Sequence, residues 1–310
     1  MIKKVVVTIG DPAGCGPIIT LKAIENIRRK DLRFIVVGDR KVLEEIPTFR
    51  RIRRKIELID LNTKGISKLK KGKVTKLGGI ASISYLNKAL EIVTKRKIPS
   101  LVTAPLSKEA VKLSFPNFFG HTEYLANYFG IKRFAMMMVS RNFKVVLFTR
   151  HIDFKEVPLQ IKKKELIENF HLIYSFLKER FKVDTPKIGV CSLNPHAGID
   201  TYLGEEEKVI KEAIDSSLLP LRGPYPADTI FIPTNMKKFH CIIALYHDQG
   251  MIPFKLLSFK EGVNLTVGLP IIRTSPAHGV AFDRVREGKY LVFSSMGEAI
   301  RLGAFLSYSS

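Results

Sequence analysis

The first thirty residues, MIKKVVVTIGDPAGCGPIITLKAIENIRRK (1–30), contain the pattern that decides the fold. A run rich in β-branched residues, Lys4–Ile9, predicts a strand. The Gly- and Pro-rich segment Gly10–Pro17 joins it to an apolar-periodic stretch, Pro17–Arg29, which predicts a helix. Proline suits the first turn of a helix, because an N–H at that position would have no helical partner. Since no small-residue cleavage site follows the apolar run, we expect a first strand and not a signal peptide.

The same alternation of short apolar runs and amphipathic stretches continues to the end of the chain. This pattern is typical of α/β proteins whose sheets are covered on both faces. The further predicted strands are Arg33–Val37, Ser100–Thr103, Ala135–Val139, Val145–Thr149, Lys187–Ser192 and Cys241–Tyr246. The further predicted helices are Ile80–Lys95, His121–Phe129, Lys162–Phe181, Glu205–Ser216 and Ser295–Leu306.

Length and composition exclude several classes of protein. The chain has 310 residues, which suggests about two domains. A hydrophobic content of 45% and a charged content of 26% argue against disorder. Three scattered cysteines exclude a disulfide framework and predict reduced, mostly buried thiols. No apolar stretch approaches the ~20 residues of a membrane helix. We therefore expect a soluble cytoplasmic protein that does not enter a membrane.

The chain is strongly basic, with 51 basic and 29 acidic residues and a net charge of +22. Much of the excess lies in the segment Arg50–Lys76. Such a segment could attract anions in general or bind nucleic acid. It contains no aromatic residue for base stacking. We interpret it as a solvated basic face and expect no nucleic-acid partner.

The histidines suggest a tertiary metal site. His151, His196 and His247 each end a predicted strand or open the loop after it, whereas His171 and His240 are interpreted as structural. The separations of the first three fit no local zinc motif. A three-histidine site assembled by the fold remains open, because imidazole is a good ligand for divalent metals.

The glycine loop Gly10–Pro17 matches neither GxGxxG nor the P-loop pattern. Asp11 in this loop could either bind substrate or cap the following helix.

Other residues could bind an anion. Lys255, Asn264 and Arg273 are candidates in the last third of the chain. His121 and Thr122 stand at a predicted helix start, where backbone N–H groups favour phosphate. The alternative for Thr122 is an N-cap.

A set of motifs, in this order, resembles the 4-hydroxythreonine-4-phosphate dehydrogenase family of vitamin B6 biosynthesis. The motifs are GDPAGCGP (10–17), VTAPLSKEA (102–110), FGHTEYLA (119–126), NPHAG (194–198), GPYPADT (223–229), ALYHDQGMIPFK (244–255), GVNLTVGLPIIRTSPAHGVAFD (262–283) and SMGEAI (295–300). The resemblance extends from about Ile9 to Ala299. Three positions depart from the family pattern: Cys15 and Ile18 in the first loop, and Ala277 where many members have an acid.

The resemblance implies a fold like that of isocitrate and isopropylmalate dehydrogenases, with two α/β domains flanking a cleft and no Rossmann fingerprint. The first domain would comprise residues 1–128 and 268–310, and the second residues 129–267 with much of the dimer interface. Members of the family are homodimers whose active sites are shared between subunits. We therefore expect a homodimer.

The resemblance also implies the site residues. The metal ligands would be His151, His196 and His247, and the metal would be Zn, Mg or Co. Lys255, Asp228 and Asp248 would be the catalytic candidates. The substrate-binding residues would be His121, Thr122, Lys255, Asn264 and Arg273.

The implied reaction is NAD- or NADP-dependent oxidation of 4-phosphohydroxy-L-threonine to 2-amino-3-oxo-4-phosphooxybutanoate. This product decarboxylates to 3-amino-2-oxopropyl phosphate, on the route to pyridoxal 5'-phosphate. One alternative is a paralogue that oxidises a phosphorylated sugar acid such as D-threonate 4-phosphate. More remote alternatives are a three-histidine metal phosphohydrolase and a basic nucleic-acid-binding protein.

Overall fold

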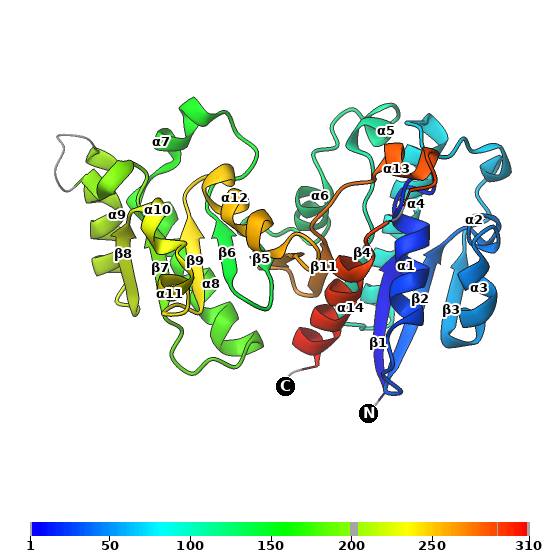
Figure 1. Cartoon of the computed structure of the whole chain (residues 1–310), viewed down its shortest axis with the longest axis horizontal. Coiled ribbons are helices and arrows are strands. Elements are labelled where there is room, and N and C mark those ends of the chain that lie inside the picture. Colours follow the sequence, from blue (N-terminus) through cyan, green and yellow to red (C-terminus); the bar gives the residue numbers. More distant parts are fainter. Residues whose placement is uncertain (1, 199–203, 290, 309–310) are drawn as a thin grey trace. The chain divides into compact units, whose positions relative to one another are not determined.

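The computed structural model describes residues 2–198, 204–289 and 291–308, and it confirms the α/β class (Figure 1). The described residues form two compact units. The first contains residues from 2–130 and 269–308, and the second contains residues from 131–268.

The first unit is built on a parallel sheet with the strand order β3-β2-β1-β4-β11. Its central strand carries the fully buried residues Val5, Val6 and Val7. Burial on both faces is what a continuous β-branched run predicts for a parallel strand. The strands are β1 (Lys3–Thr8), β2 (Leu32–Gly38), β3 (Ile56–Asp60), β4 (Ser100–Thr103) and β11 (Ile272–Pro276).

Helices cover both faces of this sheet. α1 connects β1 to β2, and α4 connects β3 to β4 on the other side of β1. Because crossover connections between parallel strands are right-handed, these two helices lie on opposite faces of the sheet. α14 packs against α1 and the strands β11, β4 and β1. The α-helices are α1 (Gly16–Glu25), α2 (Arg40–Glu44), α3 (Pro47–Ile52), α4 (Lys76–Lys95), α5 (Lys108–Lys112), α6 (His121–Tyr128), α13 (Phe282–Arg286) and α14 (Ser294–Ser307); the short 3-10 helices are η1 (Arg53–Lys55) and η2 (Ile66–Lys68).

The chain changes direction across the sheet between β1 and β4, because β1 is followed by β2 on one side and later joined by β4 on the other. In open α/β sheets, ligands bind outside the carboxyl ends of the strands at such a switch point. The loops that leave β1 and β4 are tied together here, since Asp11 N–H donates to the Pro105 carbonyl at 2.9 Å. The first unit therefore has a candidate ligand-binding edge.

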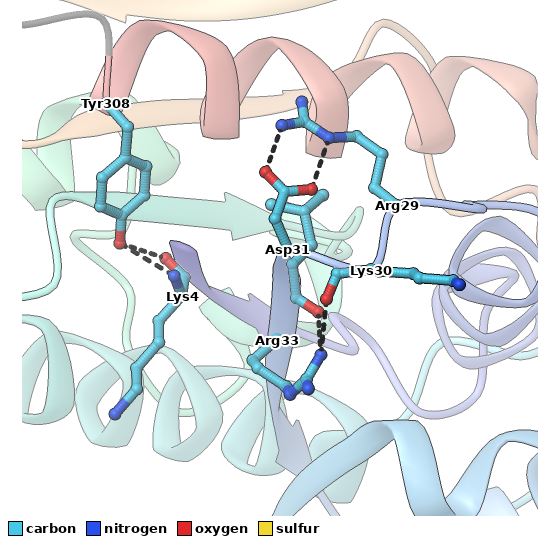
Figure 2. Close-up of polar contacts among 7 residues, drawn as sticks. Lys4, Arg29, Lys30, Asp31, Arg33 and Tyr308 are labelled. Carbon is cyan, nitrogen blue, oxygen red and sulfur yellow. Dashed lines mark hydrogen bonds and ion pairs between the residues drawn. The ribbon is translucent and has the colours of Figure 1, made fainter. Parts of the chain in front are cut away.

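The opposite, amino-terminal edge of the sheet is closed by polar contacts (Figure 2). The Tyr308 hydroxyl accepts from Lys4 N–H and donates to the Lys4 carbonyl, both at 2.9 Å. The Arg29 guanidinium donates two bonds to the Asp31 carboxylate, at 3.0 and 2.6 Å. These contacts fix Tyr308 and the start of β2 away from the candidate edge.

The second unit contains a mixed sheet with the order β10-β5-β6-β9-β7-β8. β5 runs antiparallel to β10 and β6, whereas β6, β9, β7 and β8 are parallel to their neighbours. The strands are β5 (Ala135–Val139), β6 (Lys144–Leu147), β7 (Ile188–Cys191), β8 (Leu221–Tyr225), β9 (Cys241–Ala244) and β10 (Val263–Val267).

The longest helix of the second unit, α8, packs against α9 and β10, and α12 packs against β6 and β9. Three glutamates in the first turn of α9 suit the positive end of its dipole. The α-helices are α7 (Val157–Gln160), α8 (Lys163–Arg180), α9 (Glu205–Ser216), α10 (Ala227–Ile230), α11 (Pro233–Met236) and α12 (His247–Ser258); the 3-10 helices are η3 (Phe154–Glu156) and η4 (Pro195–Gly198).

Every predicted strand and helix is present, with ends that differ by at most four residues. One expectation is wrong: His247 does not open a loop but is the first residue of helix α12. Pro253 lies inside this helix, and it concealed the helical pattern in the sequence.

Candidate active site

The glycines of the first loop are required by close packing in the first unit. A Cβ at Gly10 would lie 2.2 Å from the Pro105 carbonyl oxygen, and one at Gly16 would lie 2.1 Å from the Ile9 carbonyl oxygen. Gly10 also has a φ of +68°, which favours glycine. The close approach of backbone segments at the switch point therefore requires glycine at these positions.

Asp11 is completely buried in this loop. Its Oδ1 accepts from Ala13 N–H at 2.9 Å, while its Oδ2 has no hydrogen-bond partner among the described residues. Burial raises the pKa of the carboxyl group to about 6, although backbone N–H groups of Ala13 and Ser107 lower it. Helix α1 begins after Cys15 without a side-chain cap, so Asp11 is not its N-cap. The capping alternative for Asp11 is wrong.

Arg273 on β11 places a buried cation beside the carboxyl end of β4. Arg273 is only 2% exposed, and its Nε and Nη2 donate hydrogen bonds to Thr103 Oγ1 at 3.1 and 2.6 Å. Burial lowers the pKa of the guanidinium to about 10, and the charge of Glu123 opposes this change. The group therefore remains cationic near neutral pH. A buried arginine is suited to bidentate recognition of a phosphate or carboxylate.

His121 is the first residue of α6 and lies in the electrostatic field of Arg273. Burial, followed by the charges of Arg273 and Lys108, lowers the pKa of its ring well below the usual value. The N-cap of α6 is Gly120, which provides no side-chain cap. Thr122 is buried in the first turn, so the N-cap alternative for Thr122 is wrong. Arg273 thus acts electrostatically on His121, which stands at a helix start without a side-chain cap.

His247 and His151 approach each other in the second unit. Their ring centroids are 5.7 Å apart. Asp248 Oδ1 lies 2.6 Å from His247 Nδ1. When Nδ1 carries the proton and donates a hydrogen bond to this carboxylate, Nε2 keeps a lone pair that can bind a metal. The pair therefore has the chemistry of two metal ligands with one orienting acid.

His196 lies in a strained loop after β7. His196 and Ala197 both adopt left-handed backbone conformations, with φ of 54° and 56°. Non-glycine residues in this conformation are uncommon, and strained backbone of this kind is found at active sites and ligand clamps. The buried Glu207 holds the preceding residues, because its Oε1 accepts from the N–H groups of Leu193 and Asn194 at 3.0 and 2.7 Å.

Gln249 connects the two histidine loops of this unit. Its Oε1 accepts from Leu245 N–H and its Nε2 donates to the Ser192 carbonyl, both at 2.7 Å. Leu245 leads into His247, and Ser192 leads into the loop of His196. Neither Gln249 nor Glu207 was predicted from the sequence to support the segments that carry the histidines. An interior glutamine or glutamate gives no sequence signal that distinguishes it from a surface residue.

The described residues do not assemble the complete metal site. No group of three or more His, Cys, Asp or Glu side chains in residues 2–198, 204–289 and 291–308 is placed to hold a metal ion. His151 and His247 are together, and His196 is not joined to them. Two of the three predicted ligands therefore fit a metal by position and chemistry, and the trio stays a prediction.

The other predicted residues of the second unit are dispersed. Lys255 is exposed on α12, and it lies seven residues after Asp248, which places both on one side of the helix. Asp228 is exposed in the first turn of α10. Asn264 lies on β10, and its buried Oδ1 has no partner among the described residues. No hydrogen bond or ion pair in the described parts of the chain joins Lys255, Asp228 or Asn264 to the histidines.

Several residues have the structural roles expected for them. His171 lies in α8, and His240 Nδ1 accepts from Lys187 N–H at 2.9 Å. The three cysteines are free and buried. Cys15 donates to the Gly279 carbonyl at 3.4 Å, and burial raises the pKa of its thiol to about 12. No helix in the described ranges is long and apolar enough to span a membrane.

Comparison with known proteins gives a consistent result. A family model described as "Pyridoxal phosphate biosynthetic protein PdxA" matches residues 19–303. A relative from Aquifex aeolicus named 4-hydroxythreonine-4-phosphate dehydrogenase is 39% identical over 97% of this chain and 98% of its own. A relative from Cupriavidus necator named D-threonate 4-phosphate dehydrogenase is 35% identical over 97% of this chain and 96% of its own.

A solved structure is also similar over nearly the whole chain. The crystal structure of 4-hydroxythreonine-4-phosphate dehydrogenase from Klebsiella pneumoniae has a TM-score of 0.83 and 30% identity, and the match covers 98% of this chain and 99% of that one.

Proposed function

The chain belongs to the pyridoxal phosphate biosynthetic protein PdxA family, and on this premise we propose that it oxidises 4-phosphohydroxy-L-threonine with NAD or NADP. The product, 2-amino-3-oxo-4-phosphooxybutanoate, is a 3-keto acid and loses CO2 to give 3-amino-2-oxopropyl phosphate. The chain is an oxidoreductase by family, and the substrate, the choice of nucleotide and the metal are parts of the proposal.

The observation that carries the proposal is the buried cation in the first unit. Arg273 is held by Thr103, and its charge acts on His121, the first residue of α6. An arginine recognises phosphate or carboxylate through a planar fork of N–H donors. A substrate with an anionic phosphate fits this arrangement, and its binding here would position the substrate before the chemical step.

His151, His247 and His196 would hold a divalent metal, which we propose to be Zn, Mg or Co. When bound, the nicotinamide accepts the hydride and the metal lowers the pKa of the substrate hydroxyl group. Asp248 orients the His247 ring through Nδ1. This contact makes Asp248 a positioning residue and a poorer candidate for the general base.

Lys255 is the candidate that we favour for proton transfer. It lies on the side of α12 that carries Asp248, and no described residue forms an ion pair with it. A positioned acid–base group accelerates a reaction by about 100- to 10,000-fold. Asp228 remains the alternative for this role, and Asn264 offers an unpartnered Oδ1 to a hydroxyl or amino group of the substrate.

A homodimer is the proposed assembly, with active sites shared between subunits. Helix α12 and its C-cap residue Phe259 carry an exposed apolar stripe at positions i, i+4 and i+7: Ile252 is 59% exposed, Leu256 80% and Phe259 63%. Such a stripe is unusual on a surface that faces only water. A second copy of the chain that covers it would also approach the helix that begins with His247.

The second candidate function is oxidation of D-threonate 4-phosphate, which the relative from Cupriavidus necator favours. The two substrates differ at C2, which carries an amino group in one and a hydroxyl group in the other. Parallel assays of both substrates distinguish these functions.

The metal part of the proposal is tested by metal content in the absence of any substrate. We expect purified wild-type protein to bind one divalent ion per site and His247→Ala to lose most of it. His171→Ala, which removes an exposed histidine of α8, is the matched control. Equal metal content in all three proteins would contradict the histidine site.

A further inference from the structure

Lys108 carries a cationic group that the site described above does not use. It is the first residue of α5, which follows the loop after β4. Ser107 fixes the start of this helix, because its Oγ accepts from Ala110 N–H at 3.1 Å. The position of Lys108 is therefore set by the same strand whose last residue, Thr103, holds Arg273.

The side chain of Lys108 extends over the start of α6. A methyl group on Gly120 would lie 3.2 Å from Lys108 Cε and 3.5 Å from Lys108 Nζ. It would also lie 3.1 Å from Glu123 Oε2. The missing side chain of Gly120 thus leaves room for the ammonium group beside the helix start.

The charges of Lys108 and Arg273 converge on one ring. Both lower the pKa of His121, which places each of them within electrostatic reach of that side chain. Glu123 is the acid that acts on Arg273. Two cations and one carboxylate leave a net charge of about +1, and the helix start adds roughly +0.5.

This balance favours a phosphate over a carboxylate. A phosphate monoester carries about −1.5 to −2 charges at neutral pH, whereas a carboxylate carries only one. We propose that Lys108 is a further substrate-binding residue that, together with Arg273 and His121, binds the phosphate end of the substrate. The inference rests on the proposed function, because it assigns one end of the proposed substrate to the first unit.

Direct binding of inorganic phosphate tests this proposal without turnover. Calorimetric titration would compare wild type with Lys108→Met, Lys108→Arg and the control Lys30→Met. Lys30 lies at the opposite, amino-terminal edge of the sheet, as Figure 2 shows. We expect Lys108→Met to weaken phosphate binding by about 10-fold, since a hydrogen bond to a charged group has that order of effect. Lys108→Arg should restore most of the affinity, and Lys30→Met should match wild type.

A steady-state measurement gives the second readout. Lys108→Met should raise KM for the phosphorylated substrate about 10-fold with little change in kcat, because no bond of the phosphate group changes in the oxidation and a contact with it contributes equally to ground and transition states. Phosphate affinity equal to that of wild type in Lys108→Met, or no phosphate binding by wild type, would overturn the role of Lys108. Phosphate binding that depends on Lys108, in a protein that does not oxidise the proposed substrate, would refute the proposed function and leave the anion site intact.

Discussion

Replacement of Asp11 by Asn should change how folding stability depends on pH. The carboxyl pKa rises from an ordinary value of 3.8 to about 6 on folding, because the group is buried. The folded state therefore binds more protons than the unfolded state between these values, and the free energy of unfolding falls as pH rises through them. The full effect is roughly 3 kcal/mol, and about 1.4 kcal/mol of it falls between pH 5 and pH 7.5.

Urea denaturation of wild type and Asp11→Asn at pH 5 and pH 7.5 measures this effect. An asparagine adds a buried amide whose energetic cost is independent of pH. The stability difference between variant and wild type is therefore compared at the two pH values. We expect Asp11→Asn to gain about 1.4 kcal/mol relative to wild type when the pH is raised from 5 to 7.5. The gain would show that the wild-type protein maintains an unfavourable buried carboxylate at the switch point.

The control is Asp31→Asn, whose carboxylate is partly exposed and bound by Arg29 (Figure 2). The side-chain hydrogen bond from Arg29 lowers the pKa of Asp31, so any dependence on pH should have the opposite sign. A stability difference for Asp11→Asn that is the same at both pH values would refute the assignment of a buried carboxyl group with a raised pKa.

Three further predictions concern the two candidate sites. Arg273→Met should lower kcat/KM for the phosphorylated substrate by at least about 30-fold and leave the nucleotide affinity nearly unchanged, since loss of a buried charged contact costs about 2–5 kcal/mol. Arg301→Met on α14 is the control. Equal losses in kcat/KM and in nucleotide affinity would contradict the role of Arg273. His121 should remain neutral in the folded protein, because burial and the nearby cations lower its pKa. The unfolded state then binds more protons below about pH 6.5, so wild-type stability should fall on acidification and His121→Gln should reduce that fall, as denaturation at pH 5 and 7.5 would measure. Gln249→Leu leaves the Leu245 N–H and the Ser192 carbonyl without their partner, and it should lower the free energy of unfolding by about 2–4 kcal/mol. Thermal denaturation measures this loss, and a variant as stable as wild type would contradict the role of Gln249 as a bridge.

The sequence predicted the central strands of both units because they are buried runs of β-branched or other apolar residues. It did not predict β3, whose residues are only partly buried, or β8, which contains Gly223 and Pro224. β10 and β11 were also missed, because the segment 262–283 was interpreted through its polar residues and not through its apolar alternation. Edge strands and strands that carry site residues have weaker patterns than core strands.

The candidate site was predicted in part for a similar reason. Histidines that follow strands predicted a shared metal site, and the rings of His151 and His247 do lie close to each other. Spacing along the chain contains no information about which loops approach each other, so the place of His196 relative to the other two histidines stays a prediction. The contacts of Gln249, Glu207 and Lys108 depend on tertiary packing alone.

The most direct measurement of the central claim is NAD(P)H formation by the purified protein with 4-phosphohydroxy-L-threonine, before and after chelation of metal. D-Threonate 4-phosphate serves as the parallel substrate, and His247→Ala as the variant. We predict turnover of the first substrate that is lost on chelation, restored by a divalent metal and absent in the variant. Reduction of the cofactor only with the sugar-acid phosphate, or with neither substrate although metal and nucleotide both bind, would contradict the proposed function.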